Sequence, residues 1–168
     1  MTKRNVMITI RTDRSQMAAE LFEELADDAM EMLGEEPDTE ESTEMMVEGR
    51  LVTGTSRVEL VYDETATSGM GGSVTTVGFD RATPGLVSMM RTGTVYSALV
   101  FEEGKRHVSV YDTPFSSFDI CVRTLHVQNE LLQKGRLGLE YLIEVHGAQA
   151  ERCRMEITVR NSEELFSN

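Results

Sequence analysis

The chain has 168 residues, of which 40% are hydrophobic and 27% charged, so its length and composition suit one domain with an ordinary apolar core. Its formal net charge is −13 and its pI about 4.6. This balance argues against a nucleic-acid binder, which needs clustered Lys and Arg, and against docking on anionic lipid. We therefore expect a single domain over residues 1–168 that binds neither nucleic acid nor membrane.

The acidity is concentrated in one segment near the N-terminus. Between Asp13 and Glu48 there are 14 acidic residues and one basic residue, Arg14, so this segment alone accounts for the net charge. The remainder of the chain is neutral. Residues 13–44 therefore look like an acidic insertion into a neutral fold.

Two features of the chain favour a cytoplasmic location. The apolar run after Lys3 and Arg4 is too short for a signal peptide, and no stretch approaches the roughly 18 apolar residues of a membrane span. The two cysteines, Cys121 and Cys153, are then expected to be free thiols in a reducing compartment.

The first predicted element is a strand over Val6–Thr12, in which Val6, Ile8 and Ile10 share one apolar face. The spacing then changes to steps of three and four over Ser15–Leu33, which predicts an acidic amphipathic helix. The following residues, Glu35–Glu44, include no apolar side chain and are typical of a solvated linker.

The predicted helix has two alternative roles. Its apolar stripe either packs on the rest of the domain or docks on a basic protein partner or a second copy of the chain, because an uncovered stripe tends to associate. The candidate partner-contact residues on this stripe are Met17, Leu21, Leu25 and Met32.

From Met45 onward the chain consists of short strand-like runs separated by glycines. The spacing matches the interval of about 8–12 residues between successive strands that is typical of an all-β sandwich or barrel. We expect about 8–10 antiparallel strands, and a sheet of that size tends to close into a barrel, which also removes its edges. The clearest runs are Val58–Asp63, Val74–Asp80, Leu86–Arg91, Val95–Phe101, Val108–Asp112, Ser117–Thr124, Leu137–Val145 and Cys153–Val159.

The last two runs carry the strongest alternation and predict a hairpin. Pairing Val145 with Cys153 keeps both apolar faces on the same side of the sheet. The same register sets Glu144 opposite Arg154, a favourable cross-strand pair.

Three short motifs resemble those of one family. They are LVSMMRTG at Leu86–Gly93, TPF at Thr113–Phe115 and GRLGLEY at Gly135–Tyr141. The resemblance, over about Met45–Arg160, is to the DUF1934 or YwiB-like group of uncharacterised bacterial proteins. It implies a calycin-like, lipocalin-shaped antiparallel barrel from Firmicutes, with no established activity. The chain departs from the pattern in its acidic insertion and at Ser116, where a glycine often stands.

A barrel of about eight strands holds either side chains or one small ligand in its interior. Arg91 shares a face with Val87 and Met89, and a long arginine can bury its stem while its guanidinium reaches the barrel mouth. Arg123 shares a face with Asp119: if this face points inward the pair can orient a polar ligand, and if outward it is ordinary surface. The candidate ligand-binding residues are Arg91, Tyr96, Tyr111, Phe115, Arg123 and Tyr141.

The sequence carries no recognisable catalytic, cofactor or metal signature. The histidines, His107, His126 and His146, do not follow a metal-binding spacing, and we see no nucleophile–base pair. The favoured hypothesis is a non-enzymatic barrel that binds a small apolar or amphipathic molecule without a cofactor. The alternative is a protein-interaction module that uses the acidic helix or a barrel edge, including as a homodimer.

Overall fold

The computed structural model describes residues 1–17, 40–64, 71–145 and 150–162. These residues form ten strands, with one helical turn, α3 (Leu131–Lys134), between the eighth and ninth strands. The strands are β1 (Thr2–Met17), β2 (Glu40–Thr53), β3 (Arg57–Asp63), β4 (Ser73–Asp80), β5 (Thr83–Gly93), β6 (Tyr96–Glu102), β7 (Arg106–Asp112), β8 (Ser117–Glu130), β9 (Arg136–Val145) and β10 (Ala150–Asn161). No helix in these described ranges is long and apolar enough to cross a membrane.

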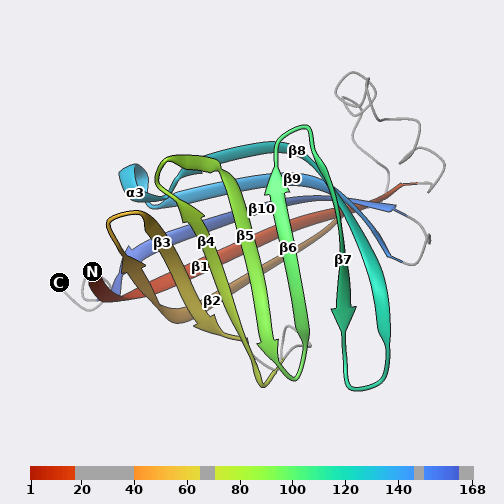
Figure 1. Cartoon of the computed structure of the whole chain (residues 1–168), viewed down its shortest axis with the longest axis horizontal. Helices are drawn as coiled ribbons and strands as arrows, with labels where there is room; N and C mark the ends of the chain where they lie inside the picture. Colours follow the sequence, from red (N-terminus) through yellow and green to blue (C-terminus); the bar gives the residue numbers. More distant parts are fainter. Residues whose placement is uncertain (18–39, 65–70, 146–149, 163–168) are drawn as a thin grey trace.

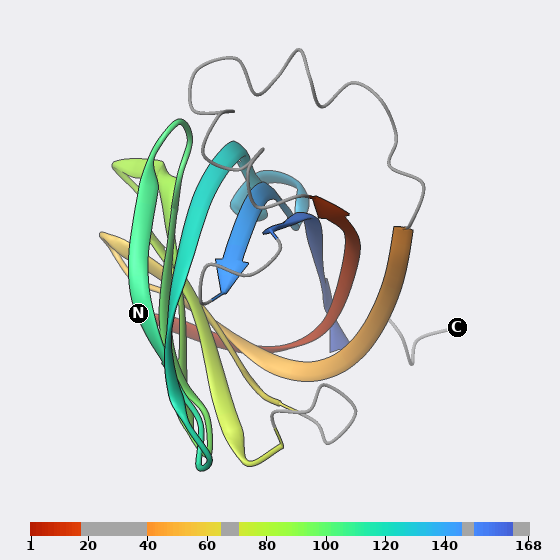
Figure 2. The ribbon, with the colours of Figure 1, turned by 90° about the vertical axis from the view of Figure 1, so that its right-hand side faces the viewer.

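The ten strands form one closed barrel in which each strand pairs with its neighbours in sequence and β1 also pairs with β10. All pairs are antiparallel. Figures 1 and 2 show the strands wrapping around a common interior. The expected mainly-β antiparallel barrel is therefore confirmed.

Alternation of side chains along each strand builds the core. On β1, Val6, Ile8 and Ile10 are buried while the residues between them are exposed or half-buried, as expected for a strand with one inward face. The interior next to these residues is tightly filled, since a Cβ added at Gly49 on β2 would collide with the Ile8 side chain. This half of the barrel is held together by burial of apolar surface.

Two apolar rows cross the interior from β3 to β6 in direct register. One row comprises Val58, Phe79, Val87 and Phe101, and the next comprises Leu60, Val77, Met89 and Leu99. All eight side chains are buried. We refer to the part of the interior that these rows occupy, together with Ile8, Leu137, Leu139 and Ile157, as the filled end.

The third row of the same four strands is polar. It comprises Tyr62, Thr75, Arg91 and Ser97, and all four side chains are buried. On the opposite wall, Arg14, Cys153, Tyr141 and Thr124 pair in register across β1, β10, β9 and β8. These two rows define the polar end, at which β1, β3, β5, β7 and β9 finish.

The structure corrects the prediction of a helical insertion that begins at residue 13. The strand β1 continues to Met17, and β2 already begins at Glu40, where it pairs with Ser15. The antiparallel ladder supplies backbone hydrogen bonds on both sides of β1, and this tertiary pairing outweighs the local composition of the acidic residues. The predicted helix beyond Met17 lies outside the described residues.

The β9–β10 hairpin is confirmed, but the predicted register is wrong by four residues. Cys153 pairs with Tyr141 rather than Val145, and Arg154 lies opposite Glu140 rather than Glu144. Arg154 and Arg152 both form ion pairs with Glu140. Because a shift of four is even, the inward and outward faces of both strands stay as predicted.

Candidate functional site

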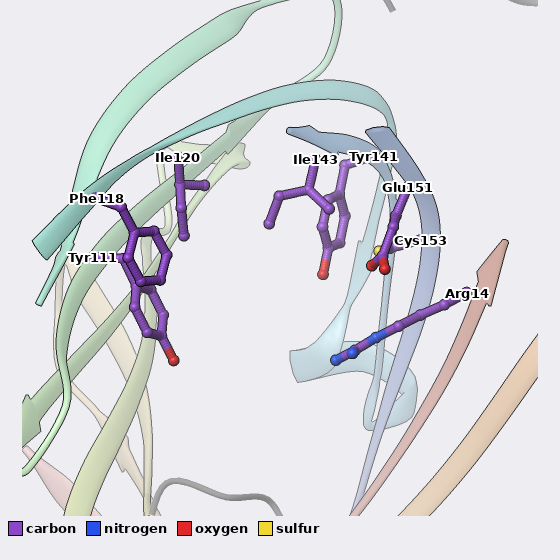
Figure 3. A pocket seen from close by; sticks show the side chains of 8 residues that line it. All are labelled: Arg14, Tyr111, Phe118, Ile120, Tyr141, Ile143, Glu151 and Cys153. Carbon is purple, nitrogen blue, oxygen red and sulfur yellow. The ribbon is translucent and has the colours of Figure 1, made fainter. Parts of the chain in front are cut away.

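The polar end contains a cavity of about 390 Å³. Figure 3 shows the cavity between a wall from β7 and β8 and a wall from β9, β10 and β1. The lining residues are Arg14, Tyr111, Phe118, Ile120, Tyr141, Ile143, Glu151 and Cys153. Each of these residues occupies an inward-facing position of its strand. The alternation that directs apolar side chains into the filled end therefore also directs these side chains into the cavity.

One wall of the cavity is aromatic. Tyr111 and Phe118 are direct partners across β7 and β8, and their rings stack with centroids 5.2 Å apart. On the other side the ring of Tyr141 packs at 4.9 Å on Phe101, a residue of the filled end. The filled end therefore forms the floor of the cavity, and two tyrosines bring hydroxyl groups to its walls.

The wall from β1, β9 and β10 carries charge and a thiol. Arg14 extends into the space between the walls (Figure 3). Burial is the main cause that raises the pKa of Cys153 to about 11; Arg14 acts against this shift, and Glu151 acts in the same direction as burial. Cys153 also shares a hydrogen bond with the Tyr141 hydroxyl. Its thiol is therefore protonated at neutral pH, which makes it a poor nucleophile.

A buried ion pair lies at the same level of the barrel. The Nε of Arg91 is 3.5 Å from the Oε1 of Glu64, and the two side chains are 11% and 1% exposed. The Thr75 hydroxyl donates a hydrogen bond of 2.5 Å to the same carboxylate oxygen. Burial and the Glu64 carboxylate raise the pKa of Tyr62, so this tyrosine is neutral at physiological pH.

Electrostatics connect this pair to the cavity. Burial raises the pKa of Tyr141 strongly, while Arg14 and Arg91 both act in the opposite direction. Both guanidinium groups therefore lie within electrostatic reach of one hydroxyl on the cavity wall. The cavity and the Glu64–Arg91 pair form one polar region of the interior.

Three buried polar atoms of this region have no hydrogen-bond partner among the residues that the structure describes. They are Glu64 Oε2, Ser97 Oγ and Thr124 Oγ1. Ser97 is the direct cross-strand neighbour of Tyr111, and Thr124 is that of Tyr141. Buried polar atoms are nearly always paired in folded proteins, so three unpaired ones next to a cavity mark it as a place for polar contacts.

The structure brings three of the six sequence-predicted ligand residues to this region. Tyr111 and Tyr141 line the cavity. Arg91 lies inside the barrel, where Glu64 and the Met89 sulfur accept its N–H groups. These three residues come from β7, β9 and β5, so only the closed barrel places them together.

The structure does not bring the other three residues to the cavity. Tyr96 is half exposed on the outer face of β6, and Phe115 is 96% exposed in the connection between β7 and β8. Arg123 alternates with the inward residues Val122 and Thr124, so the Asp119–Arg123 face points outward. Whether a side chain points inward depends on its position in the alternation of its strand. That alternation is lost where the strand ends in a turn.

Most of the lining, and the buried Glu64 at the same level of the barrel, was missed by sequence reasoning. Glu64 follows the last residue of β3, and Arg14 lies at the start of the acidic segment, so neither stood out. A signal for Arg14 did exist: it continues the period-two series of Val6, Ile8 and Ile10 on β1. For Glu151 the corresponding signal is that it lies two residues before Cys153 and therefore on the same face of β10.

The predicted partner-contact residues do not enter this site. Met17 is the last residue of β1, whereas Leu21, Leu25 and Met32 lie outside the described residues. The other predicted contact surface was a barrel edge. In the closed ring every strand has a neighbour on both sides, but β6 and β7 pair only at Tyr96–Asp112 and Ser97–Tyr111, so the contact of a barrel edge with a partner stays a prediction.

Metal-ligating residues are not clustered in the part of the chain that the structure describes. Within it, no group of three or more His, Cys, Asp or Glu side chains could hold a metal ion. The Nδ1 of His126 lies 2.6 Å from Glu103 at the exposed surface, and His107 lies near Glu102. His146 is outside the described residues, and Cys121 and Cys153 are buried free thiols.

Comparisons with known proteins agree with this architecture. The crystal structure of the ywiB protein from Bacillus subtilis matches with a TM-score of 0.65 and 16% sequence identity, over 95% of this chain and 94% of that chain. At this identity the likeness shows the fold alone. No curated protein matches the chain. A family model described as a domain of unknown function, DUF1934, matches residues 31–157, and the chain therefore belongs to the DUF1934 family.

Proposed function

We propose that this protein is a non-enzymatic binding barrel that holds a small amphipathic molecule in the cavity at its polar end. The observation that carries the proposal is the cavity itself, about 390 Å³ in volume inside a closed barrel. Small-molecule sites in proteins are concave and have volumes of about 300–1,000 Å³. The other half of the same barrel is filled by side chains, so the cavity is a local feature and not a general looseness of packing.

The lining supports an amphipathic ligand. Tyr111, Phe118, Ile120 and Ile143 offer apolar and aromatic surface, which favours burial of a hydrocarbon or ring. Arg14, Glu151 and the tyrosine hydroxyls offer polar contacts beside that surface. An apolar wall with a few convergent polar groups is the usual composition of a ligand pocket.

The chemistry of the site supports binding rather than catalysis. The thiol that lines the cavity has its pKa raised to about 11, whereas a nucleophilic cysteine needs a lowered pKa. Two buried free thiols also fit a reducing compartment, and we infer a cytoplasmic location on that ground.

A polarity-sensitive neutral dye, Nile red, tests the site directly. Ile143→Trp adds bulk inside the cavity, and we expect it to weaken dye binding at least about tenfold, equivalent to about 1.4 kcal/mol. Val110→Trp is the matched control, because Val110 is half exposed on the outer face of β7. Equal dye affinity in both variants, or no binding to the unmodified protein, would overturn the proposal.

Native mass spectrometry of the purified protein provides a second test. We expect a small molecule to be retained by the unmodified protein and lost from Ile143→Trp, while the Val110→Trp control keeps it. Retention of the same molecule by Ile143→Trp would place its binding site elsewhere.

A further inference from the structure

The cavity and its surroundings carry charges of both signs. Glu64 is paired with Arg91 at the level of the cavity. Arg14 and Glu151 both line the cavity and act in opposite directions on the Cys153 thiol. Among the described residues that line the cavity or form this ion pair, two cations are therefore balanced by two anions.

This balance disfavours a charged ligand group. Moving an ion out of water costs several kcal/mol, and the cost is recovered only where a partner of opposite charge is available and well placed. Here the buried Arg91 is already engaged by Glu64 and by the Met89 sulfur. An incoming carboxylate or ammonium would leave the interior with a net charge.

The polar groups that line the cavity show what a neutral group would meet. The Glu151 carboxylate only accepts hydrogen bonds, and the Arg14 guanidinium only donates them. The hydroxyls of Tyr111 and Tyr141 can donate as well as accept. A matching group therefore has both a donor and an acceptor.

From these contacts we propose that the cavity selects molecules whose polar end is uncharged and both donates and accepts hydrogen bonds, as a primary amide does. This inference rests on the proposed function and makes it specific. The amide N–H donates to the Glu151 carboxylate, and the amide oxygen accepts from Arg14 or from a tyrosine hydroxyl. The apolar remainder of the molecule lies against Tyr111, Phe118 and their neighbours.

Three probes with the same eight-carbon length test the selection: octanamide, octanoate and octylammonium. Their affinities are measured by isothermal titration calorimetry at pH 7 with the full chain. We expect octanamide to bind at least tenfold more tightly than either charged probe. Octanoate or octylammonium binding as tightly as octanamide would overturn the inference and leave the binding function standing. If none of the three binds, the proposed function itself fails.

Charge variants test whether the preference for the neutral probe comes from the balance of Arg14 and Glu151 or only from the general cost of burying an ion. Glu151→Gln leaves Arg14 unbalanced, so the preference for octanamide over octanoate should shrink by about threefold or more. Arg14→Gln should shrink the preference over octylammonium by a similar factor. Glu156→Gln and Arg11→Gln are matched controls, because these residues lie on the same strands but face outward and are exposed. Unchanged preferences in Glu151→Gln and Arg14→Gln would contradict the inference.

Discussion

The filled end and the polar end of this barrel are built by the same strands with the same alternation, yet the polar end contains a cavity of about 390 Å³ where the filled end has packed apolar rows. At the filled end the inward positions of β3 to β6 carry apolar side chains in two consecutive rows. One further step along the same strands, the inward positions are Tyr62, Thr75, Arg91 and Ser97. The difference shows that the alternation along a strand determines which residues face inward. The polarity of those residues determines whether their side chains fill the interior or leave a cavity.

The physical reason is that apolar and polar side chains fill space under different constraints. Hydrocarbon side chains interdigitate to a density close to that of a crystal, with almost no directional requirement. A guanidinium or carboxylate must instead be held where its partners are, as Arg91 is held by Glu64. Such directional contacts limit how tightly side chains can pack at the polar end.

The largest expected effect is the loss of the buried ion pair. Arg91→Met leaves the Glu64 carboxylate buried without its cation, and we expect the free energy of unfolding to fall by about 3–5 kcal/mol. Urea denaturation at pH 7 measures it. Adding Glu64→Gln to Arg91→Met should recover a large part of this loss. A decrease below about 1 kcal/mol in Arg91→Met would show that the pair is not structurally important.

Truncations sharpen the contrast between the two ends. Leu139→Ala at the filled end should lower the free energy of unfolding by about 3 kcal/mol, because it opens a void in a packed core. Ile143→Ala, on the same face of β9 but half-buried beside the cavity, should lower it by about 1 kcal/mol. Equal losses measured by urea denaturation would contradict the distinction between the ends.

The Cys153 thiol predicts a loss of stability at alkaline pH. The folded chain keeps the thiol proton up to about pH 11, whereas an unfolded chain releases it near the ordinary value of 9.0. The folded state therefore binds more protons between pH 9 and 11, so the free energy of unfolding falls as pH rises, by an amount on the order of 2 kcal/mol. Tyr62 and Tyr141 act in the same direction at higher pH.

Cys153→Ala isolates the part that belongs to the thiol. Urea denaturation at pH 8, 9.5 and 11 should give a shallower decline in this variant than in the unmodified protein. If the two pH profiles are parallel, the thiol is not buried as the structure shows.

The smallest effect is expected outside the barrel. Phe115 is almost fully exposed, so Phe115→Ser should change the free energy of unfolding by less than about 0.5 kcal/mol and leave octanamide affinity unchanged. Calorimetric titration of this variant beside the unmodified protein measures the affinity. A clear loss of binding would show that the connection between β7 and β8 reaches the ligand.

Much of the fold could be predicted from the sequence because the alternation of inward and outward side chains along a strand is a local property. The alternation of Leu137, Leu139 and Tyr141 shows their shared face without any knowledge of partners. The register of β9 against β10 was missed because it depends on how many residues the hairpin loop uses, and here Glu151 already pairs with Ile143. A slip of four residues leaves both faces intact, so alternation alone could not detect it.

The candidate site was harder to predict than the fold because it is assembled from distant strands. Arg91 was recognised since an arginine on an apolar face is conspicuous. Its partner Glu64 follows the last residue of β3 and looks, in sequence, like one of many surface acids. Glu64 continues the period-two series of Val58, Leu60 and Tyr62, but only the pairing of β3, β4 and β5 shows that it meets Arg91.

Methyl NMR of isoleucine-labelled protein during titration with octanamide tests the central claim most directly, because isoleucines lie at both ends of the barrel. Ile120 and Ile143 line the cavity, whereas Ile8 and Ile157 are completely buried at the filled end. We predict that the methyl resonances of Ile120 and Ile143 shift with octanamide while those of Ile8 and Ile157 stay in place. Unchanged resonances at Ile120 and Ile143, or shifts confined to Ile8 and Ile157, would contradict a ligand site at the polar end.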